Sequence, residues 1–314
     1  RFYRGGKLEQ EHSVNERGNK HGRAREFAPD GTVLRDASYD NGSEAGLARS
    51  FHPGGGLRRA SFHAVPGGEQ AHAEFTQRGQ LARLRCGARP LLAPAVDDAR
   101  LCGFGAAAQV ELFDEGGRVR TRLRLVEGKP MRAENLHANG QPATIEETDG
   151  SRRVERRYAE DGVLRREIAW TAGERGAVKE LEREFSERGT LVREQRWSAG
   201  ELAGDRSFYL NGQPRSSTEY RRADGQVHSV EREFHDNGAL AFEGAYTAPA
   251  ARRGRVDTIA VGAHQRFDAG GRKISETVHD ARGKPARERA WDEAGTLVRD
   301  EEVFEDGSRR AFAR

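Results

Sequence analysis

The segment Phe234-His-Asp-Asn237-Gly238-Ala-Leu240 carries the pattern that decides the fold, an aromatic residue followed four positions later by a glycine. The pattern recurs about every 24 residues along the whole chain. A period of this size is typical of repeat proteins, in which each unit is too small to bury a core alone and is stabilised by its neighbours. The eleven aromatic copies and one degenerate copy are Phe2/Gly6, Phe27/Gly31, Phe51/Gly55, Phe75/Gly79, Phe113/Gly117, Tyr158/Gly162, Phe185/Gly189, Phe208/Gly212, Phe234/Gly238, Phe267/Gly271, Trp291/Gly295 and the degenerate Leu136/Gly140.

The residue before the repeat glycine predicts a β-hairpin turn. It is Gly, Asn or Asp in nine of the twelve copies, and Asn-Gly and Asp-Gly favour a two-residue type I′ turn, which needs positive φ at both positions. A turn at Asp30-Gly31 places Phe27 opposite Leu34. It also places Glu26 opposite Arg35.

Charges, which were not used to choose this register, agree with it. Facing positions carry opposite charges, and each such pair contributes on the order of 0.2–1 kcal/mol to the stability of the sheet. Arg157 opposite Arg166 is an exception. The pairs are Arg25/Asp36, Arg156/Glu167, Arg183/Glu194, Arg232/Glu243, Arg289/Asp300, Glu26/Arg35, Glu74/Arg83 and Glu184/Arg193.

A second anchor, apolar or aromatic, stands eight residues after most repeat glycines, and a further turn follows it. These anchors are Val14, Tyr39, Leu125, Trp170, Trp197, Tyr220, Tyr246 and Val303. Each repeat therefore supplies two strands and two turns. The prediction is an all-β fold, an elongated repeat array of about twelve antiparallel β-hairpins that forms one long twisted meander sheet over residues 1–314.

Composition narrows the functional classes. Only 35% of the residues are hydrophobic and 33% are charged, which is poor for one large core but consistent with a thin sheet. Acidic and basic residues are interleaved and leave a net charge of +3, so we expect no nucleic-acid partner. The sequence has no apolar run long enough to span a membrane. Because the chain opens at Arg1, we expect a signal or lipoprotein segment to have been removed.

The only two cysteines bracket the largest interruption of the repeat, an insertion over residues 86–102. A Cys86–Cys102 disulfide would close this loop and contribute roughly 3 kcal/mol in the chain-entropy model. Two unrelated free thiols are the alternative. The bridge would indicate an oxidising compartment, in a bacterium the periplasm or cell envelope.

Candidate partner-binding residues lie in the insertions and among the anchors. An apolar stapled loop suits partner binding, although the same loop would equally well fold over the sheet and cover one face. A second insertion over residues 247–257 is basic and suits an acidic partner or lipid headgroups, with a solvated loop as the alternative. The candidates are Leu91, Leu92, Val96, Leu101, Trp170, Trp197, Tyr220, Arg252 and Arg253.

No catalytic, cofactor or metal motif was found. The ten His residues are scattered, and there is no phosphate-binding glycine loop or nucleophile elbow. His63 and His72 flank the segment Pro66-Gly67-Gly68. The two histidines would form a two-His site or, more simply, lie beside an exposed turn. We therefore expect a non-enzymatic protein with no cofactor.

The motifs of the second and ninth copies resemble the variant MORN repeat of bacterial YwqK-like proteins. They read Phe27-Ala-Pro-Asp30-Gly31-Thr-Val33 and Phe234-His-Asp-Asn237-Gly238-Ala-Leu240. Many proteins of that group are described as antitoxin or immunity components, so the resemblance implies steric neutralisation of a protein toxin or interbacterial effector. The alternative is a cell-envelope scaffold with peripheral envelope association that binds proteins, glycans or lipid headgroups.

Overall fold

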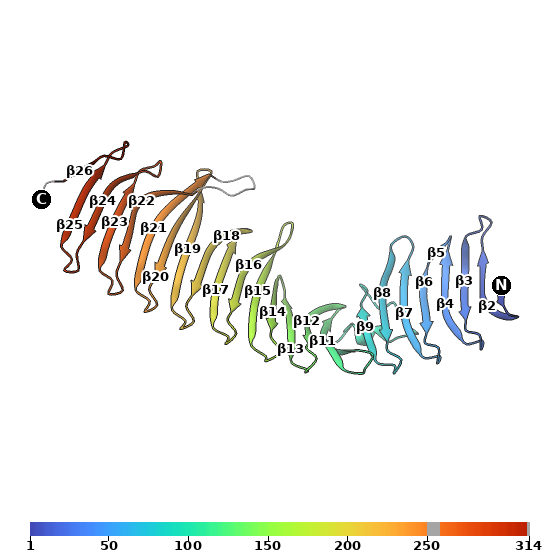
Figure 1. The fold of residues 1–314 in the computed structure, drawn as a ribbon. Coiled ribbons are helices and arrows are strands. Elements are labelled where there is room, and N and C mark those ends of the chain that lie inside the picture. Colours follow the sequence, from blue (N-terminus) through green and yellow to red (C-terminus); the bar gives the residue numbers. More distant parts are fainter. Residues whose placement is uncertain (250–257, 313–314) are drawn as a thin grey trace. The chain divides into compact units, whose positions relative to one another are not determined.

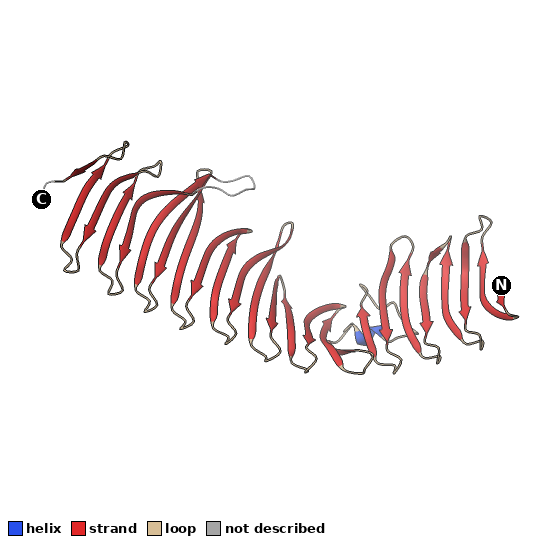
Figure 2. Cartoon of the chain, in the orientation of Figure 1, coloured by secondary structure: helices blue, strands red, loops and turns tan. Residues whose placement is uncertain are grey.

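The computed structural model describes residues 1–249 and 258–312 of the chain. Within them, regular structure is almost entirely antiparallel β-strand (Figure 1, Figure 2). The chain divides into two compact units, Arg1–Gly162 and Val163–Arg314. In each unit the strands follow one another across the sheets in chain order, most neighbours are joined by a turn, and the sheets do not close into a barrel. The predicted all-β hairpin repeat is confirmed.

The first unit contains two runs of paired strands, separated at the insertion. One sheet ends at β9 and the next begins at β10, because the connecting segment folds into a short helix and loops instead of a hairpin turn. The elements are β1 (Phe2–Arg4), β2 (Lys7–Val14), β3 (Lys20–Phe27), β4 (Val33–Asp40), β5 (Ser43–Glu44), β6 (Gly46–Phe51), β7 (Leu57–Ala64), β8 (Gly68–Phe75), β9 (Leu81–Arg85), α1 (Asp98–Leu101), β10 (Ala108–Phe113), β11 (Val119–Val126), β12 (Lys129–Leu136), β13 (Pro142–Asp149) and β14 (Arg152–Tyr158).

The second unit is an uninterrupted meander within which each strand pairs with the next. Its strands are β15 (Leu164–Gly173), β16 (Gly176–Phe185), β17 (Leu191–Ser198), β18 (Glu201–Phe208), β19 (Pro214–Ala223), β20 (Gln226–Phe234), β21 (Leu240–Pro249), β22 (Ile259–Phe267), β23 (Lys273–His279), β24 (Pro285–Trp291), β25 (Leu297–Val303) and β26 (Arg309–Ala311).

The turn at the repeat glycine has positive φ at both residues, as predicted, only in the first copy, at Gly5-Gly6, and differs from the predicted type I′ turn in the other described copies. In the second copy Gly31 has φ +90° while Asp30 is not in the left-handed region. The Gly31 amide donates to the carbonyl of Ala28 at 2.9 Å, as in a type I turn that ends in a G1 bulge. Phe27 therefore faces Val33 and not Leu34.

The predicted register survives because the bulge restores the residue count. Beyond it Glu26 faces Arg35 and Arg25 faces Asp36, as predicted, and the charge pairs of β8, β16, β20 and β24 also face their predicted partners. The true type I′ geometry occurs at the other turn of the repeat, for example at Asn41-Gly42, where both φ values are positive.

Side chains link successive turns at the repeat-glycine edge. His137 Nε2 donates to the carbonyl of Tyr158 at 3.0 Å, and Asn139 Nδ2 donates to the carbonyl of Glu160 at 2.8 Å. The aromatic-x-x-Asn-Gly pattern thus encodes a contact with the following repeat as well as a turn. The equivalent contacts in the second unit are Tyr209 to Phe234, Asn211 to Asp236, His235 to Phe267 and Asn237 to Ala269.

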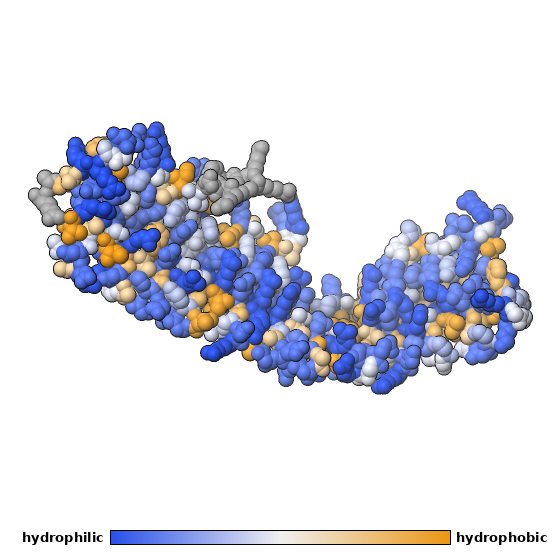
Figure 3. Space-filling view, viewed as in Figure 1, coloured by the Kyte–Doolittle hydropathy of each residue, from blue (hydrophilic) through white to orange (hydrophobic). Residues whose placement is uncertain are grey.

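Buried apolar residues are few and concentrate beneath the insertion. Polar and apolar side chains are interspersed over the face seen in Figure 3, as expected when sheet faces are only partly covered. The main buried cluster consists of Ala71, Ala73, Leu81, Leu92, Val110 and Leu125.

Candidate binding surfaces

The insertion covers the sheet with its apolar residues. Cys86 and Cys102 form the predicted disulfide, with their Cα atoms 5.8 Å apart. Leu92 is 0% exposed and belongs to the buried cluster, while Leu91, Val96 and Leu101 pack against it half-buried. This placement favours the covering role that the sequence left open.

Hydrogen bonds and close backbone approaches hold the insertion in place. The Asp98 side chain is buried, and its Oδ2 accepts from the amides of Leu91 and Leu92 at 2.6 and 3.0 Å. The amide of Gly128, in the β11–β12 turn, donates to the carbonyl of Cys102 at 2.9 Å. A Cβ at Gly103 would lie 2.4 Å from the carbonyl oxygen of Leu125. The insertion is therefore packed directly against the adjoining hairpin.

Three of the predicted aromatic candidates share one face of the second unit. Trp170 is paired with Lys179, whose ammonium lies 4.5 Å from the ring centroid of Trp197. Tyr220, Ser229 and Tyr246 occupy facing positions on consecutive strands. We call Trp170, Trp197, Tyr220 and Tyr246 the aromatic row.

The register of the intervening strand joins the two halves of this row. Gln195, Asp205 and Thr218 lie opposite one another on β17, β18 and β19. Trp197 and Tyr220 stand two positions further along their strands and so project to the same face. All four aromatic residues are half-buried, which leaves part of each ring exposed to a partner.

Charged groups beside the aromatic row are paired. Arg193 donates to both carboxylate oxygens of Asp205 at 3.1 and 2.6 Å, and Gln195 donates at 2.9 Å. Burial opposes ionisation of Asp205, yet these bonds hold its pKa below the ordinary value. Burial, together with the Asp205 charge, raises the pKa of Tyr220.

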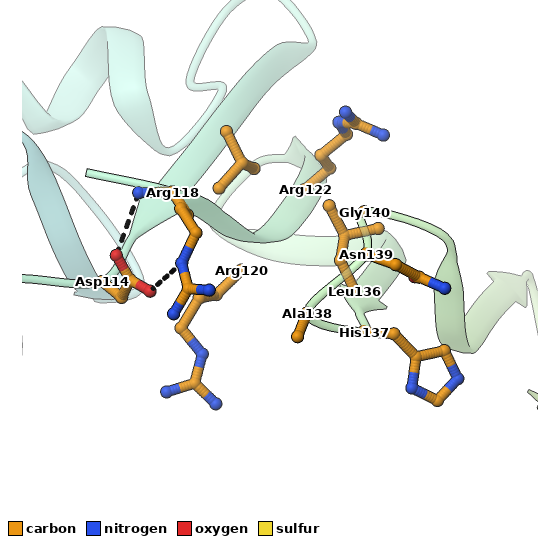
Figure 4. Close-up of a pocket in the computed structure, with 10 residues that line it drawn as sticks. Asp114, Arg118, Arg120, Arg122, Leu136, His137, Ala138, Asn139 and Gly140 are labelled. Carbon is orange, nitrogen blue, oxygen red and sulfur yellow. Dashed lines mark hydrogen bonds and ion pairs between the residues drawn. The ribbon is translucent and has the colours of Figure 1, made fainter. Parts of the chain in front are cut away.

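A third surface, which the sequence analysis missed, lies on β11 and the turn before it. Arg118, Arg120, Arg122 and Arg124 occupy alternate positions and form what we call the arginine row. Figure 4 shows Arg118 and Arg120 extending to one side of the strand and Arg122 to the other, and these residues line a hollow together with Leu136 and the turn of His137 to Gly140. The alternation of Arg with Val, Thr and Leu was the signal in the sequence.

The hollow coincides with the one repeat that lacks its aromatic ring. Leu136 stands where the other copies carry Phe, Tyr or Trp, and it lines the hollow with the arginines. A second hollow adjoins it and shares Arg122, with Arg124, Arg132 and Glu134 also in its lining. The four arginines thus line two hollows that share Arg122.

The remaining candidates are the basic residues of the second insertion and the pair His63 and His72. Arg252 and Arg253 lie outside the described residues, as does most of the 247–257 insertion. His63 lies 3.2 Å from Glu44, and His72 lies 2.6 Å from Glu69. Within residues 1–249 and 258–312, no three His, Cys, Asp or Glu side chains form a group that could hold a metal ion. In the same ranges no helix is long and apolar enough to cross a membrane.

The strand order and turns define an antiparallel β-hairpin repeat protein, and comparison with known families identifies the repeat. Residues 20–41, which span β3, its turn and β4, match the MORN repeat variant. The resemblance to variant MORN repeats is confirmed for this copy. No curated protein matches the chain.

Solved structures add only distant similarities. The crystal structure of TcdB2-TccC3-Cdc42 aligns with 96% of this chain and 18% of its own, at 11% identity and a TM-score of 0.21. The Photorhabdus luminescens Tc holotoxin pore aligns over the same shares at 11% identity and a TM-score of 0.20. A putative 6-phosphogluconolactonase from Bacteroides uniformis aligns over 92% and 90%, at 10% identity and a TM-score of 0.14. This chain spans less than a fifth of the length of the matched chains in the first two structures. TM-scores this low support no argument about fold or function.

Proposed function

We propose that the protein is a non-enzymatic binding protein whose ligand is another protein, held by the aromatic row. The observation that carries the proposal is the alignment of Trp170, Trp197, Tyr220 and Tyr246 on one face, each half-buried. Rings anchored in a sheet lose little conformational entropy on binding, and Trp, Tyr and Arg dominate interface hot spots. A stable complex centred on this row would bury at least about 1,000 Å².

The proposed partner is a protein toxin that is neutralised sterically, as by an immunity protein. The resemblance to bacterial variant MORN repeat proteins supports this step, and the confirmed repeat at residues 20–41 is consistent with it. The Cys86–Cys102 disulfide supports a location outside the reducing cytoplasm, in the periplasm or cell envelope. Binding alone, without a chemical step, would block the toxin's active site or the path of its substrate.

The test begins with crosslinking of the tagged protein in its native host and identification of the crosslinked partner by mass spectrometry. The purified partner is then titrated against the wild type, Trp197→Ala and Tyr220→Ala. We expect each variant to weaken binding by about 2 kcal/mol or more. Tyr3→Ala is the matched control, because Tyr3 is 60% exposed in the other unit; it should bind as the wild type does.

Neutralisation is measured separately, by expressing the identified partner in a surrogate bacterium with and without this protein. Rescue of growth by the wild type and by Tyr3→Ala, but not by Trp197→Ala, is the expected result. A partner that is harmless when expressed alone would contradict the immunity role. Recovery of peptidoglycan or lipid instead of a protein would favour an envelope scaffold.

A further inference from the structure

Glu231, in the middle of β20, has a carboxylate that the described part of the chain does not pair. Its side chain is half-buried, and burial, followed by the charge of Glu233, raises its pKa above the ordinary value. Within residues 1–249 and 258–312 this side chain forms no ion pair and no hydrogen bond. A half-buried charge loses hydration that nothing in the fold replaces, so a cation supplied by a partner would stabilise it.

A buried carboxylate elsewhere in the second unit shows the contrast. Glu276, which is 7% exposed, forms ion pairs with Lys273 and with Arg289, each at 2.9 Å. The hydrogen bond from Lys273, together with the charge of Arg289, holds the pKa of Glu276 below its ordinary value. The sheet thus neutralises Glu276 internally and supplies no such partner to Glu231.

The strand register places Glu231 beside two rings of the aromatic row. Tyr220 and Tyr246 both face Ser229, from β19 and β21, the strands on either side of β20 (Figure 1). Glu231 stands two positions after Ser229, and the pairing of β20 with both neighbours continues without a register shift as far as Glu233. Because side chains two positions apart share a face, Glu231 projects on the same side of the sheet as the two tyrosines.

The two tyrosines flank a shallow gap. Neighbouring strands are about 4.7–4.9 Å apart, so the backbones of Tyr220 and Tyr246 are separated by about twice that distance. Ser229, a small residue that is 7% exposed, lies between them. In both tyrosines burial raises the pKa of the phenol most and the charge of Glu231 raises it further. The carboxylate therefore lies within electrostatic reach of both rings.

Aromatic groups enclose the β21 side of this gap. The His264 ring packs edge-on against Tyr246, with centroids 4.9 Å apart, and against Phe242 at 5.7 Å. Gly244, which faces Glu231, permits this packing, because a Cβ there would lie 2.6 Å from Phe242 Cζ and 2.9 Å from His264 Nδ1. We call Tyr220, Ser229, Glu231, Phe242 and Tyr246 the Glu231 site.

Two basic side chains near the Glu231 site are engaged elsewhere. His264 Nε2 donates to the carbonyl of Ala245 at 2.8 Å. Arg266 lies over the Phe242 ring, with its Cζ 5.1 Å from the centroid, and among the described residues it forms no ion pair with Glu231. The site therefore combines a carboxylate with aromatic surface and lacks a cation.

We propose that the Glu231 site receives an arginine side chain of the protein partner. A guanidinium group donates paired, charge-assisted hydrogen bonds to a carboxylate and stacks on aromatic faces, whereas the lysine ammonium is a compact, strongly hydrated charge. Arginine is also one of the residues that dominate interface hot spots. The inference rests on the proposed function, since it names the residue type with which the partner contacts the aromatic row.

The experiment is an NMR titration of the full chain with isotope-labelled tyrosine rings. The chain has six tyrosines, and the variants Tyr220→Phe and Tyr246→Phe assign the two signals of interest. The probes are the N-acetyl amides of arginine, of its uncharged isostere citrulline and of lysine, together with choline, a lipid headgroup. The test variant is Glu231→Gln. Its matched control is Glu187→Gln, which changes an exposed glutamate of the same unit.

The arginine amide should shift the ring signals of Tyr220 and Tyr246 saturably and should bind more tightly than the other three probes. Its affinity should fall about tenfold or more in Glu231→Gln and change less than about twofold in Glu187→Gln. Because Glu231 has no partner in the fold, Glu231→Gln should unfold at a urea concentration no lower than the wild type does, so weaker binding would not reflect lost structure. Citrulline, lysine or choline binding as tightly as arginine, or unchanged affinity in Glu231→Gln, would each overturn the inference.

The two proposals fail in distinguishable ways. If Trp197→Ala abolishes partner binding while Glu231→Gln binds the partner as the wild type does, the protein-binding function stands and the arginine contact is wrong. If no protein partner is bound but the arginine amide behaves as expected, the proposed function fails and the Glu231 site remains a guanidinium-binding site.

Discussion

Truncation of Leu92 tests whether the insertion is part of the local core or a loosely attached loop. Leu92 is 0% exposed and lies in the cluster with Ala71, Leu81, Val110 and Leu125. Leu92→Ala removes about three methylene equivalents, worth about 2.4 kcal/mol at roughly 0.8 kcal/mol each. The cavity left behind adds to this loss, so the free energy of unfolding should fall by about 2.5–5 kcal/mol.

The assay combines urea unfolding, followed by far-UV circular dichroism, with hydrogen exchange resolved by mass spectrometry. Tryptophan fluorescence is unsuitable, because Trp170, Trp197 and Trp291 all lie in the second unit. Repeat proteins couple mainly to nearest neighbours, so amides of β8, β9, β10 and β11 should exchange faster. Amides of β23 and β24 should be unaffected.

Leu210→Ala is the matched control, since the same side chain is 75% exposed there. It should change the free energy of unfolding by less than about 0.5 kcal/mol. A Leu92→Ala variant indistinguishable from this control, with unchanged exchange in β9 and β10, would refute the assignment of the insertion to the core.

Three further outcomes are expected. The Cys86–Cys102 bridge joins residues 16 positions apart, and its reduction should lower the free energy of unfolding by about 3 kcal/mol. Urea unfolding with and without reductant measures this difference. No change would show that packing alone holds the insertion. Hydrogen bonds from Arg23 and Arg49 hold the pKa of Asp36 below its ordinary 3.8. The stabilisation of the fold by the Asp36 carboxylate is therefore complete above that pH and is lost as the pH falls through the folded-state pKa. Unfolding measured over a pH series should show Asp36→Asn less stable than the wild type near neutrality and equally stable in acid; a difference that stays constant with pH would contradict this. A Cβ at Gly103, where φ is +72°, would lie 2.4 Å from a carbonyl oxygen, whereas at Gly31, where φ is +90°, nothing lies within 4 Å of it. Gly103→Ala should therefore lower the free energy of unfolding by at least about 1 kcal/mol more than Gly31→Ala. Equal chemical-denaturation midpoints for the two variants would argue against the clash.

The register was predictable from local signals, although one turn type was not. Glu26 and Arg35 face each other whether the chain turns at Asp30-Gly31 or through the bulged turn that the structure contains. Both solutions consume the same number of residues, so charge pairing could not distinguish them. The two turns differ in the backbone conformation of Asp30 and in the residue that faces Phe27, and Asp is compatible with either turn.

The role of the insertion was not predictable, because it depends on contacts between segments remote in sequence. Nothing local to Leu92 indicates that Ala71 and Val110 lie beneath it. For the same reason, deletion of residues 88–100 is a poor test of whether the insertion binds a partner. That deletion would expose the cluster, so loss of binding could not be separated from loss of structure.

Candidate side chains were partly recoverable from the sequence. The eight-residue offset from the repeat glycine identified Trp170, Trp197 and Tyr220, and the structure places them on one face with Tyr246. The arginine row was missed, because a count of net charge hides a local excess on Arg120 and Arg124. A test of charge at alternate positions along each strand would have found it.

The links between successive turns have a consequence for how such a chain can change length. At the repeat-glycine edge, contacts such as Asn139 to Glu160 tie several turns to the next, so an added residue in one of those turns would break the link to the neighbouring repeat. The opposite edge accommodates turns from the two residues of Asn41-Gly42 to the five of Asn15–Asn19, although Asn15 and Asn19 donate to Asn41 there, and the insertion after β9 leaves from it. New loops can therefore be grafted at that edge, where they would diversify the surface without disturbing the periodicity that holds the strands in register.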